Sequence, residues 1–235
     1  MTNAEIFIEK FKELENLLRN KFGIQDYSRS VLKEIENKPQ FRHLKDDLNY
    51  IREIRNILQH KPSINGEFPI QPNSEINNNM QRIIDYINNP PKAYNYCIKI
   101  DNVCYADKDD IIFPYMQAMK ENVYTHIPIL DSGVVKGVFS ENTLFGALIE
   151  DELVYEKDKT TFSSPLIKKY SELNNHASES FEFIRKDLYL EDVKVIFRKN
   201  FIANKRLAMV FITQNGRPEE KLLGIITPWD ILIND

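Results

Sequence analysis

HIPILDSGVVKGVFSENTL at residues 126–144 and AMVFITQNGRPEEKLLGIITPWDIL at residues 208–232 decide the fold of this 235-residue chain. Each stretch reads as an apolar strand, a turn that contains glycine, a second apolar strand and a hydroxyl residue that starts a helix. Each stretch also follows a predicted helix, at about residues 110–121 and 190–200 respectively. The same order of elements, found twice, predicts an internal structural repeat.

The N-terminal part of the chain has helical rather than strand periodicity. Apolar residues recur at three- and four-residue spacing over residues 4–22, 40–60 and 74–87, and a shorter helix is predicted at about residues 27–36. Three prolines and a glycine mark residues 61–73 as a loop. The sequence therefore predicts four helices packed as a bundle.

Asn88-Asn89-Pro90-Pro91 is the best domain boundary, because consecutive prolines break helices and stiffen a linker. Beyond it, short runs rich in Tyr, Ile and Val predict strands at residues 94–100, 126–130, 134–139, 207–213 and 222–226. The predicted fold class is thus α+β. An all-α four-helix bundle over residues 1–90 precedes an α/β tandem repeat, whose copies span residues 92–150 and 151–235.

Two matched strand–strand–helix units, each with a leading helix, resemble a tandem pair of CBS (cystathionine-β-synthase-type) motifs, also called a Bateman module. The resemblance covers about residues 92–235. In CBS motifs the turn Gly-h-h-Thr/Ser-x-x-Asp, where h is apolar, often contributes to a nucleotide site, and Gly224–Asp230 matches it completely. The resemblance implies a regulatory ligand such as AMP, ADP or ATP, with S-adenosylmethionine and cyclic dinucleotides as alternatives.

The chemistry of this motif suits a nucleotide. Thr227 would lie at a helix N-terminus, where free backbone N–H groups favour a phosphate, and Asp230 could accept hydrogen bonds from both ribose hydroxyls. Lys205 and Arg206 lie near enough in the motif order to reach phosphates, and Ala208 completes the predicted nucleotide-binding set in this copy. The alternative is a capped helix start, because Thr-Pro-x-Asp also favours a helix N-terminus without any ligand.

The first copy departs from the pattern. It keeps the hydroxyl residue, Ser140, but has Thr143 where the family has Asp. Threonine can hydrogen-bond a ribose, but it lacks the charge-assisted strength of a carboxylate. We therefore expect at most one strong site, built around Thr227 and Asp230, with Ser140 as the residue that the first copy supplies.

The two copies are also unusually far apart in the sequence. Gly137 and Gly224, the glycines of the two motifs, are separated by more residues than the family leads us to expect. The excess falls near residues 151–180, and it leaves the shape of the cleft between the copies open.

Arg55-Asn56-Ile57-Leu58-Gln59-His60 closes the third predicted helix. Cleavage of RNA through the 2′-hydroxyl needs a proton shuttle, a role that suits a histidine side chain, and His60 is the candidate. Arg55 offers a bidentate fork for phosphate oxygens, and Asn56 could orient the histidine or the scissile group. Basic residues also outnumber acidic ones between Lys38 and Lys61, which favours contact with a polyanion.

This stretch resembles the Arg-x(4–6)-His signature of HEPN domains, many of which are metal-independent endoribonucleases that pair the motif across a dimer interface. The resemblance covers residues 1–90 and implies a homodimer with RNA as a partner and no required cofactor. The alternative is a solvated, salt-bridged helix end. In that case the protein is a non-catalytic nucleotide sensor, and the bundle serves dimerisation or partner docking.

Composition excludes several other classes. Hydrophobic residues make up 42% and charged residues 28%, which is ordinary for a globular protein. The net charge of -4 does not favour binding of polyanions by the molecule as a whole. Two cysteines are too few for a disulfide framework, and the four histidines show no metal-ligand spacing, so no metal site is predicted. Neither a signal peptide nor an apolar run of spanning length occurs, so we expect a cytoplasmic protein with no membrane partner. The aromatic residues, Trp229 included, are expected mainly in the core.

Overall fold

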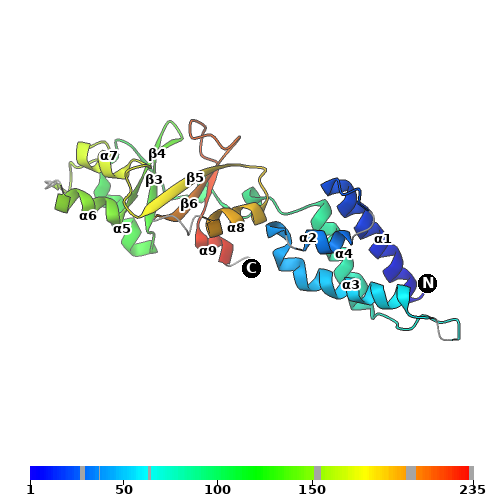
Figure 1. Cartoon of the computed structure of the whole chain (residues 1–235). Helices are drawn as coiled ribbons and strands as arrows, with labels where there is room; N and C mark the ends of the chain where they lie inside the picture. Colours follow the sequence, from blue (N-terminus) through cyan, green and yellow to red (C-terminus); the bar gives the residue numbers. More distant parts are fainter. Residues whose placement is uncertain (27–29, 37, 63–64, 151–154, 200–204, 233–235) are drawn as a thin grey trace. The chain divides into compact units, whose positions relative to one another are not determined.

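The structure is a computed structural model that describes residues 1–26, 30–36, 38–62, 65–150, 155–199 and 205–232. The chain divides into two compact units, Met1–Pro91 and Lys92–Asp235 (Figure 1). The first unit is helical, and the second combines helices with two β-sheets. The predicted mixed α+β class is therefore confirmed. None of the described helices combines the length and the apolar character that a membrane span requires.

Helices of the first unit enclose one apolar core. They are α1 (Asn3–Phe22), α2 (Val31–Ile35), a 3₁₀ turn (Pro39–Leu44), α3 (Lys45–His60) and α4 (Ser74–Asn88). The core contains the apolar residues that recur at helical spacing in the sequence, because those positions share one face of each helix. Burial of this shared face is what holds the helices together, since helices of such length are marginal alone in water.

Local sequence determines where α1 and α4 begin and end. The Thr2 hydroxyl accepts a hydrogen bond from the Glu5 N–H at 3.3 Å, and the Thr2 N–H donates to the Glu5 carboxylate at 2.7 Å, which is a capping box. Gly23 ends α1 in the left-handed conformation, at φ 64°. Asn73 caps α4 by accepting a hydrogen bond from the Ile76 N–H at 3.0 Å.

Two predicted helices differ from the structure at their starts. The helix predicted at residues 27–36 overlaps residues 27–29, which lie outside the described residues, and α2 begins only at Val31. The helix predicted from residue 40 starts as the 3₁₀ turn, and regular α-helix begins at Lys45. Pro39 occupies the first position of that turn, where its missing N–H removes no intrahelical bond.

In the second unit the sequence repeat corresponds to a structural repeat. The first copy contains β2 (Ala106–Asp107), α5 (Ile112–Asn122), β3 (His126–Asp131), β4 (Val134–Ser140) and α6 (Glu141–Glu150). The second copy contains β5 (Glu179–Arg185), α8 (Leu190–Lys199), β6 (Arg206–Thr213), β7 (Gly224–Ile226) and α9 (Pro228–Leu232). In both copies the first strand runs parallel to the second, and the second antiparallel to the third.

The two sheets have the strand orders β2-β3-β4 and β1-β7-β6-β5. The extra strand β1 (Ile98–Lys99) precedes the first copy in sequence, yet it pairs antiparallel with β7 of the second copy. Only part of the strand predicted at residues 94–100 is therefore extended, because residues Ala93–Asn95 form a 3₁₀ turn. The copies also meet at the hairpins, where Val134 bridges Lys221 and the Leu222 N–H donates to the Gly133 carbonyl oxygen.

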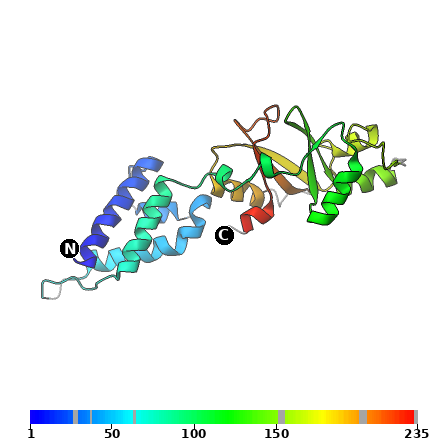
Figure 2. The ribbon, with the colours of Figure 1, turned by 180° about the vertical axis from the view of Figure 1, so that it is seen from behind.

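Three apolar clusters stabilise the second unit. One is shared by both sheets and includes Val138 and Phe211, which are fully buried. A second joins α5, α6 and α7 (Pro165–Ser171) to the first sheet, and a third joins α8 and α9 to the second sheet. Figures 1 and 2 show these helices on the outer sides of the sheets. The shared cluster couples the copies, because each sheet needs the other to bury the apolar side chains of its inner face.

Candidate functional site

The second unit holds a cavity of about 570 Å³ where the two copies meet. Four segments that are distant in sequence form its walls: residues 98–104, residues 123–126, the start of β6 at residues 206–209, and the turn from β7 into α9 at residues 225–230. The volume lies within the range of small-molecule sites. The segment of excess length near residues 151–180 contributes no described residue to these walls.

Four of the predicted nucleotide-binding residues line this cavity: Arg206, Ala208, Thr227 and Asp230. Sheet register explains why they meet. β6 and β7 are antiparallel neighbours, with Val210 opposite Ile226. The residues that enter β6 and those that leave β7 therefore lie at the same edge of the sheet.

The other two predicted residues, both among the described ones, do not line the cavity. Lys205 directs its ammonium group towards the Asn174 carbonyl oxygen, at 3.5 Å. Ser140 is only 2% exposed, and its hydroxyl lies 3.4 Å from the Thr143 hydroxyl. Ser140 begins a helix in the first copy as Thr227 does in the second, so the two residues are related by the repeat but do not share one pocket.

Asp230 holds the turn between β7 and α9. Thr227 donates its backbone N–H and its hydroxyl to Asp230 Oδ2, at 2.7 and 2.8 Å respectively. The capped helix start considered from the sequence is therefore present. A carboxylate offers roughly four acceptor positions, so this cap is compatible with a ligand contact as well. Because α9 has only 5 residues, its dipole is a weak source of attraction for phosphate.

The first copy makes the same turn without a charge. The Ser140 N–H donates to the Thr143 hydroxyl at 3.1 Å, as the Thr227 N–H does to Asp230 in the second copy. Both Ser140 and Thr143 are 2% exposed. The substitution of Thr for Asp thus preserves the local fold and removes the carboxylate.

A buried carboxylate, Glu179, occupies the counterpart of the cavity in the first copy. It accepts a hydrogen bond from Arg206 at 2.8 Å and one from the Asn142 amide at 3.3 Å. His126 Nε2 and His176 Nδ1 lie 3.2 and 3.6 Å from its second oxygen, close enough for ion pairs. By register, His126 and Asn142 correspond to Met209 and Trp229, which line the cavity of the second copy.

Glu179 keeps its negative charge although it is only 2% exposed. Burial alone would raise the pKa of this carboxyl, but the neighbouring His126, His176 and Arg206 side chains outweigh that effect and hold the pKa well below its usual range. The counterpart position therefore already contains an anion. Sequence reasoning missed Glu179, because its four partners come from four separate segments of the chain.

Trp229 is not a core residue, so that prediction is wrong. It is 73% exposed and lines the rim of the cavity, and Tyr124, which is 41% exposed, lines the same cavity. Trp229 directly follows Pro228 in the first turn of α9. The sequence signal that could have indicated its exposure was the position of an aromatic residue inside the helix-capping motif.

Arg55, Asn56 and His60 all lie on α3 of the first unit. The Arg55 guanidinium lies 5.5 Å from the centroid of the Phe11 ring, and its NH1 is 3.4 Å from Asn56 Oδ1. His60 is exposed and is the last residue of α3. Among the described residues, no hydrogen bond or ion pair joins Arg55 to His60, so within one chain the motif does not form a closed site.

No family model matches the chain, and no curated protein matches its sequence. Solved structures that resemble part of it include CBS-domain proteins. A hemolysin-like protein containing a CBS domain, from Oenococcus oeni PSU, has a TM-score of 0.42 and 16% identity over 66% of this chain and 95% of that one. CbpB, solved in complex with c-di-AMP, has a TM-score of 0.48 and 13% identity over 66% of this chain and 91% of that one. CBSX2, solved in complex with AMP, has a TM-score of 0.41 and 14% identity over 61% of this chain and 95% of that one.

Proposed function

We propose that the second unit is a CBS-type tandem pair that binds one adenine nucleotide in the cavity of about 570 Å³. The observation that carries this proposal is the meeting of Arg206, Ala208, Thr227 and Asp230 in one cavity. The nucleotide, AMP, ADP or ATP, acts as a regulatory ligand and not as a required cofactor.

The walls of the cavity divide into parts that suit the parts of a nucleotide. Trp229 and Tyr124 offer aromatic faces on which a base can stack. Asp230 is the acceptor for ribose hydroxyls, since a charged acceptor strengthens such bonds. Arg206, whose side chain is 67% exposed, is the cation for phosphate.

A single site per chain is supported by Glu179. Its charged carboxylate lies where the first copy would hold a second nucleotide, and a phosphate brought close to it would be repelled. Arg206 connects the two positions, because it lines the cavity and also donates to Glu179.

Calorimetric titration with AMP tests the site. Asp230→Ala removes the acceptor for ribose and is expected to weaken binding by about 10- to 100-fold, the range for a lost hydrogen bond to a charged group. Asp230→Asn keeps an acceptor for the cap and removes the charge, so it separates a ligand contact from a folding defect. Asp109→Ala, at an exposed position outside the cavity, is the matched control. Affinity equal to wild type in both Asp230 variants would show that the site is misplaced.

Adenosine, which lacks the phosphate, extends the same titration to Arg206. Arg206→Gln should weaken the binding of AMP and leave the binding of adenosine unchanged, because the phosphate is the one part of the ligand assigned to the guanidinium. Equal loss for both ligands would contradict that assignment.

We further propose that the nucleotide controls the first unit. One candidate activity is that of a HEPN-type, metal-independent endoribonuclease in a homodimer, where Arg55 binds the phosphate, Asn56 orients the reacting groups and His60 transfers the proton. His60 is exposed, as are two nearby cations, Lys45 on the same helix and Lys61 directly after it, and this supports the nuclease candidate.

A second candidate is a non-catalytic nucleotide sensor whose helices serve dimerisation or partner docking. The contact of Arg55 with the Phe11 ring and with Asn56 favours it, since two of the three residues assigned to catalysis already interact within the chain. The two candidates differ in one observable, the cleavage of RNA.

A further inference from the structure

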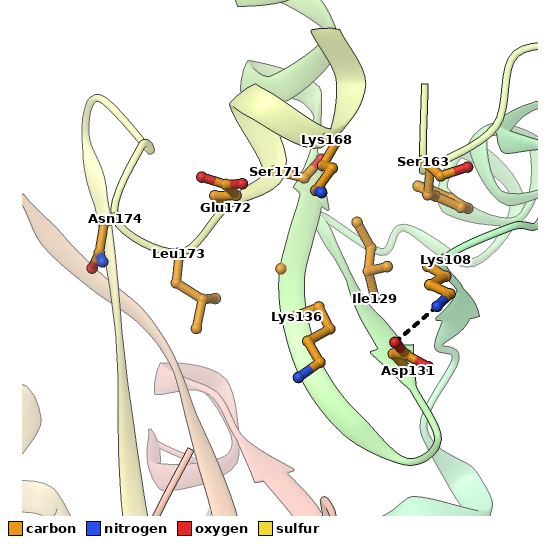
Figure 3. A pocket seen from close by; sticks show the side chains of 12 residues that line it. Lys108, Ile129, Asp131, Lys136, Ser163, Lys168, Ser171, Glu172, Leu173 and Asn174 are labelled. Atoms are coloured by element: carbon orange, nitrogen blue, oxygen red, sulfur yellow. Dashed lines mark hydrogen bonds and ion pairs between the residues drawn. The ribbon is translucent and has the colours of Figure 1, made fainter. Parts of the chain in front are cut away.

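A second cavity, of about 510 Å³, lies in the second unit and shares no lining residue with the nucleotide cavity (Figure 3). One wall is the β3–β4 end of the first sheet, and the other is the segment of residues 162–174 that contains α7. That segment belongs to the excess length between the copies. Part of the excess length therefore forms one wall of this cavity, and no described residue of it lines the nucleotide cavity.

Lysines from three different elements line the cavity: Lys108 after β2, Lys136 on β4 and Lys168 on α7. Lys108 forms an ion pair with Asp131 at 2.9 Å, drawn as the dashed line in Figure 3. Lys136 and Lys168 form no ion pair with a carboxylate among the residues that the structure describes. Glu172 also lines the cavity, so three ammonium groups face two carboxylates and a positive charge remains for a ligand.

A buried hydroxyl in the same wall lacks a partner. Ser171 Oγ is enclosed, in a residue that is 2% exposed, and it makes no hydrogen bond with any described residue. The position is constrained by the backbone, because a Cβ at Gly137 would lie 2.5 Å from the Ser171 carbonyl oxygen. A buried hydroxyl without a partner is costly, and an oxygen atom of a ligand would remove that cost.

The apolar part of the cavity argues against a second nucleotide. Ile129, Phe162 and Leu173 line it, and Phe162, the aromatic residue among the described lining residues, is only 1% exposed. No exposed ring among these lining residues can stack on a base, in contrast with Trp229 and Tyr124 in the nucleotide cavity.

We propose that this cavity binds a small phosphorylated metabolite without a nucleobase, such as a sugar phosphate. Lys136 and Lys168 hold the phosphate as two charged donors from opposite walls. The Ser171 hydroxyl bonds to a ligand oxygen, and Ile129 contacts the carbon skeleton. The ligand therefore bridges β4 and α7, which are parts of the chain that the added segment brings together.

Titration of the full chain with ribose 5-phosphate, and separately with inorganic phosphate, tests the proposal. Saturable binding of ribose 5-phosphate is expected, with weaker binding of inorganic phosphate. Lys136→Gln combined with Lys168→Gln should raise the Kd by about tenfold or more, whereas Lys120→Gln, at an exposed position on α5, should not. Lack of binding of both probes, or an unchanged Kd in the double variant, would overturn the proposal.

Two further measurements separate this site from the nucleotide site and from effects on folding. Ribose 5-phosphate also carries the ribose and phosphate groups assigned to the nucleotide cavity, so its binding to the second cavity is measured with AMP saturating the first. Under that condition it should still bind, and the loss in the Lys136→Gln, Lys168→Gln double variant should remain, so failure of one site leaves the other testable. Ser171→Ala should raise the melting temperature of the free protein, because it removes the unpaired buried hydroxyl, and should reduce the further increase that ribose 5-phosphate causes. Full competition by AMP, or a Ser171→Ala variant that binds like wild type, would contradict the assignment.

Discussion

Glu179 shows what a single residue contributes in the second unit. It is 2% exposed, and its charge is held by Arg206 at 2.8 Å and by His126 at 3.2 Å. Because its pKa lies below the ordinary value of 4.5, the folded protein binds this proton less readily than the unfolded chain. Its contribution to stability is therefore complete above that value and is lost as the pH falls through the lower, folded pKa.

Glu179→Gln should lower the free energy of unfolding at neutral pH by about 3 kcal/mol, because it removes the anion from a buried charge cluster. The difference from wild type should narrow as the pH falls below 4.5. Urea denaturation followed from neutral pH into the acid range measures both effects. Glu219→Gln, at an exposed position, is the control. Curves for wild type and Glu179→Gln that stay parallel at all pH values would contradict the assigned role.

Some residues of the candidate site are positioned by their neighbours in sequence, and others by residues that are distant in sequence. Thr227 and Asp230 could be predicted, because their hydrogen bonds lie within one turn and follow from four consecutive residues. Arg206 could be predicted because it begins the strand next to that turn. Glu179 could not be predicted, because its environment is created by residues that are distant in sequence. The exposure of Trp229 likewise depends on the cavity, which has no signature in sequence.

At the scale of elements, each copy has a glycine where a neighbouring segment crosses closely. A Cβ at Gly224 would lie 2.6 Å from both Cys97 Sγ and the Ile98 carbonyl oxygen, and one at Gly137 would lie 2.5 Å from the Ser171 carbonyl oxygen. The Gly of the motif is thus explained by packing of an edge segment and not by a turn. The two copies therefore resemble each other both in sequence and in the close approach of another segment to the motif glycine.

Gly224→Ala and Gly137→Ala form a matched pair. Each should destabilise the second unit by about 2 kcal/mol, because the added methyl group overlaps backbone atoms of the adjacent segment. Gly224→Ala alone should also weaken AMP binding, since β7 leads directly into Thr227. Thermal unfolding and calorimetry measure the two effects. Equal AMP affinities in the two variants would contradict the prediction that the position of β7 affects the nucleotide site.

Long amphipathic helices and strands with apolar runs could be predicted from the sequence, whereas short elements could not. The predicted strands at residues 126–130 and 134–139 are confirmed with extensions of one residue. Neither β2 nor α7 was predictable, because an element of 2 or 7 residues is stabilised by its neighbours rather than by its own pattern. No strand was predicted for β5 either, although residues 180–183 alternate polar and apolar side chains.

At the scale of the whole molecule, incubation with mixed RNA in the presence of a chelator distinguishes the two candidate functions. If the first unit is a nuclease, His60→Ala should lower the cleavage rate by about 100-fold or more, and AMP should change the wild-type rate. The exposed neighbour Gln59→Ala is the control, and the active species should sediment as a dimer. Absence of cleavage by wild type with and without AMP, despite AMP binding, would leave the non-catalytic sensor.

The pairing of β1 with β7 has a consequence for synthesis on the ribosome. Ile98 emerges early and Ile225, its partner, emerges more than half a chain length later. Until then β1 lacks its strand partner, which exposes the growing chain to association with other chains. Ile98 and Ile225 are also among the residues that line the nucleotide cavity, so this pocket is complete only after nearly the whole described chain has been made. Nucleotide binding by a stalled or truncated chain is therefore not expected.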